Sequence, residues 1–267
     1  MNILVLGKPK TGTTVISKTI LKSLDGETEY VFEPNSEAPF QQDYGDKSVV
    51  AKVLFDHWKG RTNDLMGCID NRHALSFDKR VIIQRDPRDE AISYLMYYPF
   101  TIKAHVQNKD DFSVWIDFLH EKERAPESIS FLAMCRKFDA LFNVNFTASI
   151  SKLNTLDGGY TRFRQQVSAS HMVFRYEDFV SGKTTALAKY LGVELSSDRD
   201  VGGKYSQTYR SGSYNNWKRY FTPEDVSFFE KHAEYLKMLG YEDWELTPPR
   251  SIPEQELSGY VARLLQD

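Results

Sequence analysis

The sequence predicts an α/β fold in which helices flank a central parallel sheet. Short, continuous apolar runs alternate with helical patterns along the chain, and a glycine-containing turn joins the first run to the first helix. Continuous apolar runs are typical of strands buried on both faces, and their alternation with helices favours parallel strands joined by right-handed crossovers. The apolar runs occupy residues 3–6, 49–55, 81–83 and 172–174.

The expected helices have recognisable ends. Asp86 followed by Pro87 resembles an N-cap followed by a proline at the first helical position. Thr222 and Asp225 predict a capping box, and Gly240 is the expected end of the helix that follows. The helical patterns themselves cover residues 13–24, 87–98 and 184–191.

Residues 1–267 are expected to form one domain, because neither an internal repeat nor a low-complexity linker interrupts them. Residues 100–170 read as a mostly helical cover over the sheet, with a break at Pro126. A C-terminal helix is expected over residues 253–266, where an apolar stripe at helical spacing indicates packing against the body of the domain or, alternatively, a dimer contact. The stripe consists of Leu257, Tyr260, Val261, Leu264 and Leu265.

The overall composition excludes some partners. The net charge is -3, from 34 basic and 37 acidic residues, so nothing in the balance favours nucleic acid or an anionic membrane surface. No segment reaches the ~20 apolar residues of a membrane span, so none is expected. The two cysteines, Cys68 and Cys135, lack metal-ligand spacing and favour a reducing compartment, with cytoplasm as the expected location.

The clearest motif is the turn GKPKTGTT at residues 7–14, between a predicted strand and a predicted helix. Backbone N–H groups at a helix N-terminus and the helix dipole favour a bound phosphate, and the glycines allow close approach. An ATP-binding loop would have a lysine at Thr13, whereas here the lysine of the loop is Lys10. This difference counts against an ordinary nucleoside triphosphatase.

Residues 9–14 resemble the P-K-[ST]-G-T-T loop of sulfotransferases that use PAPS, 3′-phosphoadenosine 5′-phosphosulfate. The resemblance implies that the loop binds the 5′-phosphosulfate and that Lys10 contacts the bridging oxygen and the sulfuryl group. It also implies the architecture of that family, a sheet with a phosphate-binding loop after the first strand, like that of P-loop proteins. The implied 5′ contacts in the loop are Lys8, Thr11, Gly12, Thr13 and Thr14.

The 3′-phosphate of PAPS needs a second cationic site. Arg85 ends the third apolar run and can direct two donors at a phosphate, and Ser93 lies two turns into the following helix. Their stretch resembles the family's R-D-P-x-D motif with a following S-Y, which implies contact with the 3′-phosphate. The structural alternative is an ion pair between Arg85 and Asp89.

Two further segments resemble the same family. Arg210, Ser211 and Gly212 resemble its R-K-G loop, with Ser211 in place of the lysine, which implies a further contact with the 3′-phosphate. Tyr176 lies in a segment that resembles the family's Y-E-D, in which the tyrosine is near the adenine.

The general base has two candidates. Lys52 matches the lysine of the family's K-T-H segment, but Leu54 replaces its histidine, and His57 follows three residues later. Glu33 resembles the catalytic glutamate of carbohydrate-type members. We favour Glu33, with His57 as the second choice. Burial can raise the pKa of Glu33, or Lys10 or Lys52 can keep it ionised, and either supports a role as base.

Together these motifs predict an enzyme that transfers the sulfuryl group of PAPS to a hydroxyl, with a carbohydrate or another small molecule as acceptor. In-line displacement would release adenosine 3′,5′-bisphosphate, and no metal is expected. One alternative is a metal-dependent small-molecule kinase, suggested by an apolar run that ends at Asp56. Another is a non-catalytic nucleotide-binding protein, suggested by Leu54 and Ser211. The acceptor and homo-oligomer formation stay open.

Overall fold

The computed structural model describes residues 1–151, 153–167, 171–203, 205, 209–248 and 251–266. These residues pack as two compact units, each with its own hydrophobic core. The sheet unit comprises Met1–Arg85 and Gly159–Lys204, and the helical unit comprises Asp86–Gly158 and Tyr205–Asp267. The single domain expected over residues 1–267 stays a prediction. No helix within the described ranges is long and apolar enough to cross a membrane.

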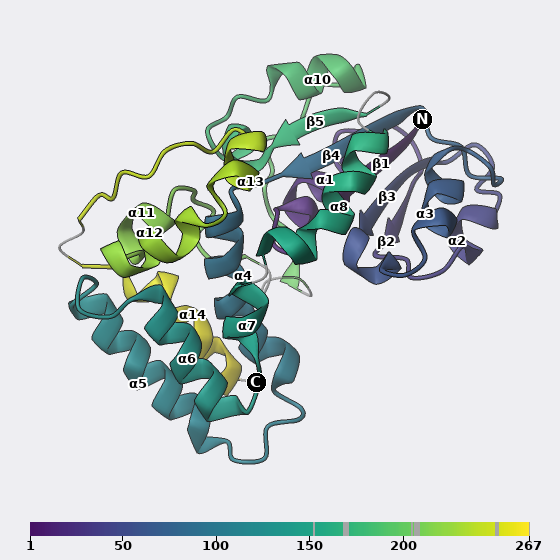
Figure 1. The fold of residues 1–267 in the computed structure, drawn as a ribbon. Coiled ribbons are helices and arrows are strands. Elements are labelled where there is room, and N and C mark those ends of the chain that lie inside the picture. The colour runs from purple at the N-terminus through teal and green to yellow at the C-terminus, as the bar shows by residue number, and fades with distance from the viewer. Residues whose placement is uncertain (152, 168–170, 204, 206–208, 249–250, 267) are drawn as a thin grey trace. The chain divides into compact units, whose positions relative to one another are not determined.

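The sheet unit confirms the predicted α/β class. Its five strands are all parallel and follow the order β2-β3-β1-β4-β5, and Figure 1 shows them as arrows running in one direction. Four strands coincide with the predicted apolar runs, except that Phe55 leaves the second run and begins a 3-10 helix, η1. The strands are β1 Asn2–Gly7, β2 Thr28–Phe32, β3 Ser48–Leu54, β4 Lys79–Gln84 and β5 Met172–Arg175.

Alternate residues of each strand face opposite layers of helices. Val5 and Val50 lie on the face covered by α1, α9 and α10. Leu6 and Ala51 lie on the opposite face, which is covered by α3, η1 and the part of α8 from Gly159 onward, seen crossing the sheet in Figure 1. The helices of this unit are α1 Thr13–Leu21, α2 Ala38–Gln41, η1 Phe55–Trp58, α3 Thr62–Ile69, α9 Tyr176–Val180 and α10 Thr185–Leu191, and α8 is Leu153–Val167.

Aromatic side chains dominate the core of the helical unit. Trp115 and Phe138 are fully buried with their ring centroids 5.2 Å apart, and Figure 1 shows α5, α6 and α14 side by side. The helices are α4 Pro87–Ile102, α5 Asp110–Arg124, α6 Phe131–Phe142, α7 Phe146–Ser151, α11 Trp217–Tyr220, α12 Pro223–Glu230, α13 Ala233–Met238, η4 Glu254–Glu256, α14 Ser258–Ala262 and η5 Arg263–Leu265.

Both predicted helix starts are confirmed in this unit. The Asp86 carboxylate accepts the N–H of Arg88 at 2.9 Å, and Thr222 forms a capping box with Asp225. The mostly helical character of residues 100–170 is confirmed by α4 to α8, and the break at Pro126 falls between α5 and α6. Residues 152 and 168–170 lie outside the described residues.

Several predicted helix ends were wrong. The helix that starts at residue 13 ends at Leu21. Helix α4 continues past Pro99 to Ile102, although proline has no N–H to bond the carbonyl of Leu95. The helix after Thr222 ends at Glu230, and Gly240 instead follows a second helix, α13.

The C-terminal stretch forms η4, α14 and η5 rather than one helix over residues 253–266. Tyr260 and Leu264 are buried as predicted, but Leu265 is 55% exposed. A 3-10 turn has three residues per turn and carries Leu265 out of the apolar stripe.

Candidate functional site

The loop between β1 and α1 presents backbone donors to an anion. Lys10 has φ 67° and Gly12 has φ 88°, so two left-handed residues turn the chain into α1. Thr11 Oγ1 donates to the carbonyl of Lys8 at 2.8 Å, which fixes the turn. The first N–H groups of a helix have no acceptor within it, and together with the helix dipole they attract negative charge. The loop therefore has the backbone form of a phosphate site.

Gly12 is required where the loop meets the end of β5. A Cβ atom at Gly12 would lie 2.2 Å from Cδ2 of Tyr176 and 2.6 Å from its Cε2. Tyr176 is the first residue of α9 and is buried, and its ring lies next to the loop backbone at Gly12. Any side chain at position 12 would displace this ring.

Arg85, which follows β4, joins the loop to the same tyrosine. Its Nη1 donates to the carbonyl of Lys10 at 2.8 Å, and its guanidinium carbon lies 4.5 Å from the centroid of the Tyr176 ring. The distance is within the range of a cation–π contact. The structure thus brings together three residues that the sequence assigned to nucleotide binding.

Lys52 connects the loop to the candidate base. It lies in β3 on the face that α1 covers, opposite Val5 and Phe32 in the strand register. Its Nζ donates to Thr14 Oγ1 at 2.7 Å and forms an ion pair with the carboxylate of Glu33. Burial lowers the pKa of Lys52, which is 2% exposed, while the charge of Glu33 and its hydrogen bond act in the opposite direction.

The backbone at Glu33 places its carboxylate beside Lys52. Glu33 follows β2, donates its N–H to the carbonyl of Lys52 at 2.8 Å and has φ 49°. Of the two environments expected for this carboxylate, the structure shows the one in which Lys52 forms an ion pair with it. His57 is exposed, and its Nδ1 lies 3.4 Å from the backbone oxygen of Glu33 rather than from the carboxylate.

The sequence analysis missed a polar contact beneath the loop. Ser17 Oγ donates to the carbonyl of Thr14 at 3.1 Å and lies 2.7 Å from the Tyr30 hydroxyl. Tyr30 and Phe32 share one face of β2, with ring centroids 5.6 Å apart, and Phe32 lies 4.5 Å from Lys52 Nζ. The alternation of aromatic residues immediately before Glu33 is the signal that could have identified them.

The remaining predicted nucleotide contacts belong to the helical unit. Arg210 is buried, and its Nη1 donates to the Tyr220 hydroxyl at 3.1 Å and to the carbonyl of Glu256 at 2.9 Å. A role at the 3′-phosphate requires Arg210 to direct another of its donors there and stays a prediction. The full set in this unit is Ser93, Arg210, Ser211 and Gly212.

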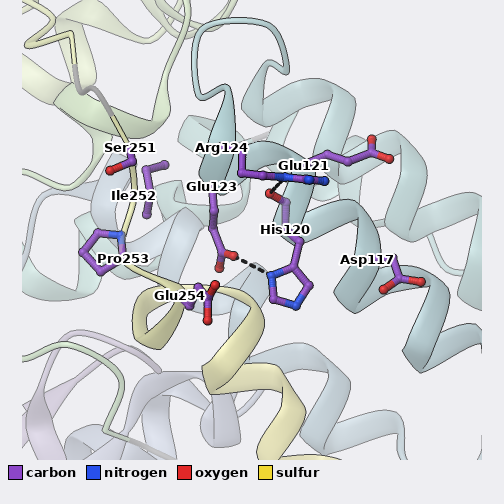
Figure 2. A pocket seen from close by; sticks show the side chains of 9 residues that line it. All are labelled: Asp117, His120, Glu121, Glu123, Arg124, Ser251, Ile252, Pro253 and Glu254. Carbon is purple, nitrogen blue, oxygen red and sulfur yellow. Dashed lines mark hydrogen bonds and ion pairs between the residues drawn. The ribbon is translucent and has the colours of Figure 1, made fainter.

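A separate cavity of about 650 Å³ opens in the helical unit (Figure 2). Its polar centre is His120, whose Nδ1 lies 3.0 Å from Glu123 Oε2. The Ser258 N–H and hydroxyl donate to the two oxygens of Glu123 at 2.6 and 2.8 Å. None of the sequence-predicted site residues lines this cavity, which is formed by residues 117, 120, 121, 123, 124 and 251–254.

The chain matches no protein-family model and no curated protein. Its structure is similar to those of sulfotransferases. One is the mouse sulfotransferase SULT7A1 complexed with PAP, with a TM-score of 0.45, 14% identity, and coverage of 91% of this chain and 89% of that one. Another is a sulfotransferase from Alicyclobacillus acidocaldarius, with a TM-score of 0.43, 14% identity, and coverage of 91% of this chain and 98% of that one.

Proposed function

We propose that this chain is a sulfotransferase that moves the sulfuryl group of PAPS to a hydroxyl acceptor and releases adenosine 3′,5′-bisphosphate. The observation that carries the proposal is the loop at the start of α1, where Lys10, Arg85 and Tyr176 meet. The sequence of the loop resembles that of PAPS-dependent sulfotransferases and lacks the helix-start lysine of ATP-binding loops.

The transfer needs positive charge at the leaving group and a base at the acceptor. The acceptor oxygen forms a bond to sulfur while the bond between sulfur and the 5′-phosphate oxygen breaks, and the electron pair stays on that oxygen. Lys10 and the N-terminus of α1 stabilise the charge that develops there. The proton of the acceptor hydroxyl passes to Glu33.

Glu33 is suited to accept this proton because its carboxylate is partly exposed and its ion pair with Lys52 holds it in place. Lys52 also donates a hydrogen bond to Thr14, so one buried ammonium links the base to the phosphate loop. Such a link fixes the base relative to the loop residues that hold the reacting group. His57 is the alternative base, and its exposure leaves it accessible to an acceptor.

The 3′-phosphate of the donor is assigned to Arg85, with Ser93 and the segment at Arg210–Gly212. A guanidinium has five N–H donors, so Arg85 can retain its bond to the carbonyl of Lys10 and still donate to a phosphate. Tyr176, held between Gly12 and Arg85, is the proposed neighbour of the adenine.

Calorimetry with two ligands distinguishes the proposed donor from that of a kinase. Adenosine 3′,5′-bisphosphate should bind, and ATP with magnesium should bind at least about tenfold more weakly. Asp56, whose position after an apolar run suggested the kinase, forms an ion pair with Lys59 through Oδ2 at 2.5 Å. The reverse order of affinities would replace the sulfotransferase proposal with the kinase.

Two variants assign the chemistry within the site. Glu33→Gln should abolish transfer of labelled sulfate from PAPS to an acceptor pool while leaving binding of adenosine 3′,5′-bisphosphate nearly intact. Lys10→Ala should weaken both, and a transfer rate within about tenfold of the wild type would remove Lys10 from the catalytic assignment. Full activity of Glu33→Gln would transfer the role of base to His57.

A further inference from the structure

Three side chains of different chemistry converge elsewhere in the sheet unit. Glu37, Cys68 and His73 each offer one ligand atom, and these atoms all lie within 4.8 Å of one another. Glu37 directly precedes α2, Cys68 lies in the last turn of α3, and His73 lies in the turn that follows α3. His73 Nε2 is 3.8 Å from Glu37 Oε1. None of the three has a role in the proposed transfer reaction.

One buried nitrogen of this cluster lacks the partner that buried polar atoms usually have. His73 Nε2 is buried and has no hydrogen-bond partner within the described part of the chain. Cys68 is a free thiol with 0% exposure, and burial, followed by Glu37 and Asp64, raises its pKa to about 12. A buried imidazole nitrogen without a protein partner is costly, and a bound ion would satisfy it.

We propose that Glu37, Cys68 and His73 bind a borderline divalent metal ion of the zinc class. Thiolate, imidazole and carboxylate are the ligands that zinc takes in proteins, whereas magnesium and calcium take oxygen. Metal–ligand bonds of about 2.0 to 2.3 Å in a tetrahedron separate the ligand atoms by roughly 3.3 to 3.8 Å. For a nitrogen and an oxygen ligand the expected separation is about 3.3 to 3.5 Å, so the 3.8 Å between His73 Nε2 and Glu37 Oε1 would shorten by about 0.4 Å on binding.

The charges of such a site balance. A divalent ion with one thiolate, one carboxylate and a neutral imidazole has no net charge, which suits a buried location. Binding deprotonates the Cys68 thiol despite its raised pKa, because the metal ion stabilises the thiolate, and the proton goes to the buffer. Glu37 is partly exposed and provides the route of entry.

The ion would fasten the segment after Glu33 to α3. That segment is already anchored at two backbone oxygens, since Trp58 Nε1 donates to the carbonyl of Pro34 at 2.9 Å and Arg61 Nη2 donates to that of Asn35 at 2.8 Å. Glu37, two residues further on, would become a third anchor. The ion thus has a structural role that holds whether or not the chain transfers sulfuryl groups.

The cluster of His120, Glu123 and Glu254 in the helical unit is a weaker candidate. Both oxygens of Glu123 already accept hydrogen bonds from Ser258, and His120 faces the same carboxylate. These atoms have the partners that His73 Nε2 lacks. This cluster instead provides a control.

The test is a titration of chelator-treated full-length protein with Co²⁺, followed by competition with Zn²⁺. One equivalent of Co²⁺ should produce a near-ultraviolet absorption from thiolate-to-cobalt charge transfer, and Zn²⁺ should remove it. Cys68→Ser should lose this absorption and bind more than about tenfold more weakly, whereas Cys135→Ser, at the other buried free cysteine, should retain both.

Because Cys68 is fully buried, Cys68→Ser could lose Co²⁺ binding through misfolding, and His73→Gln provides an independent test. It should weaken Co²⁺ binding as Cys68→Ser does, while His120→Gln leaves binding unchanged, with circular dichroism confirming the fold of each variant. Absence of the charge-transfer absorption in the wild type overturns the proposal. So does Co²⁺ binding that is lost in His120→Gln but retained in His73→Gln. Binding of adenosine 3′,5′-bisphosphate, measured in parallel, reports separately on the proposed function.

Discussion

Replacing Lys52 with methionine tests whether the buried ammonium holds the candidate site together. Methionine keeps most of the side-chain volume beside Phe32, so the variant removes charge and hydrogen bonds without opening a large cavity. Two contacts disappear, the ion pair with Glu33 and the 2.7 Å hydrogen bond to Thr14. Both depend on the same Nζ atom.

The magnitude follows from the burial of the two partners. Breaking a fully buried ion pair on one side costs about 3 to 5 kcal/mol, but the Glu33 side chain is 25% exposed and water can reach the remaining carboxylate. We therefore expect about 2 kcal/mol from the ion pair and about 1 kcal/mol from the lost bond to Thr14. The free energy of unfolding should fall by about 3 kcal/mol in total.

Urea denaturation measures this loss, and Lys59→Met is the matched control. Lys59 forms an ion pair with Asp56, but its side chain is 54% exposed, so its removal should cost less than about 0.5 kcal/mol. In a Glu33→Gln background, Lys52→Met should cost at least about 1 kcal/mol less than in the wild type. Equal effects of Lys52→Met and Lys59→Met would refute the network described here.

Two further perturbations probe the sheet unit. Burial lowers the pKa of His171 from 6.5 to about 4, so the unfolded chain takes up a proton between these values while the folded chain does not. The free energy of unfolding should therefore fall by about 2 kcal/mol as the pH drops from 6.5 to 4. Urea denaturation across this range should show a smaller fall for His171→Gln than for the wild type. An equal fall in the two proteins would contradict the role given to His171. Gly12→Ala combines a left-handed φ of 88° with a Cβ atom 2.2 Å from Tyr176, so it should weaken binding of adenosine 3′,5′-bisphosphate by more than about tenfold in calorimetry. Wild-type affinity in this variant would show that the ring of Tyr176 can move without affecting the loop.

The sequence predicted the strands and the helix starts, because these depend on residues close together in the chain. The apolar runs gave four strands, and Asp86 and Thr222 marked helix starts, because capping and strand burial involve neighbours in the sequence. Helix ends were predicted less well. The end of α12 at Glu230 and the exposure of Leu265 depend on packing that no short window contains.

The candidate site shows the same division. The glycine turn and its lysine were evident in the sequence, and so was Glu33 as a candidate base. The bond from Lys52 to Thr14 spans 38 residues and exists because the strand register places Lys52 on the side of α1. The proximity of Glu37, Cys68 and His73 likewise could not be predicted from the sequence, because their spacing along the chain matches no metal-ligand motif.

The backbone of Glu33 carries a consequence for redesign of this protein. Its φ of 49° lies in a region that suits glycine and costs other residues about 1 kcal/mol. Most substitutions at this position would keep that conformational cost and lose the ion pair between the carboxylate and Lys52. Glycine would also lose the ion pair, but it would remove the conformational cost and retain the turn. Variants designed for new acceptors should therefore carry glycine at position 33. The replacement base would then be introduced at a position on a neighbouring strand.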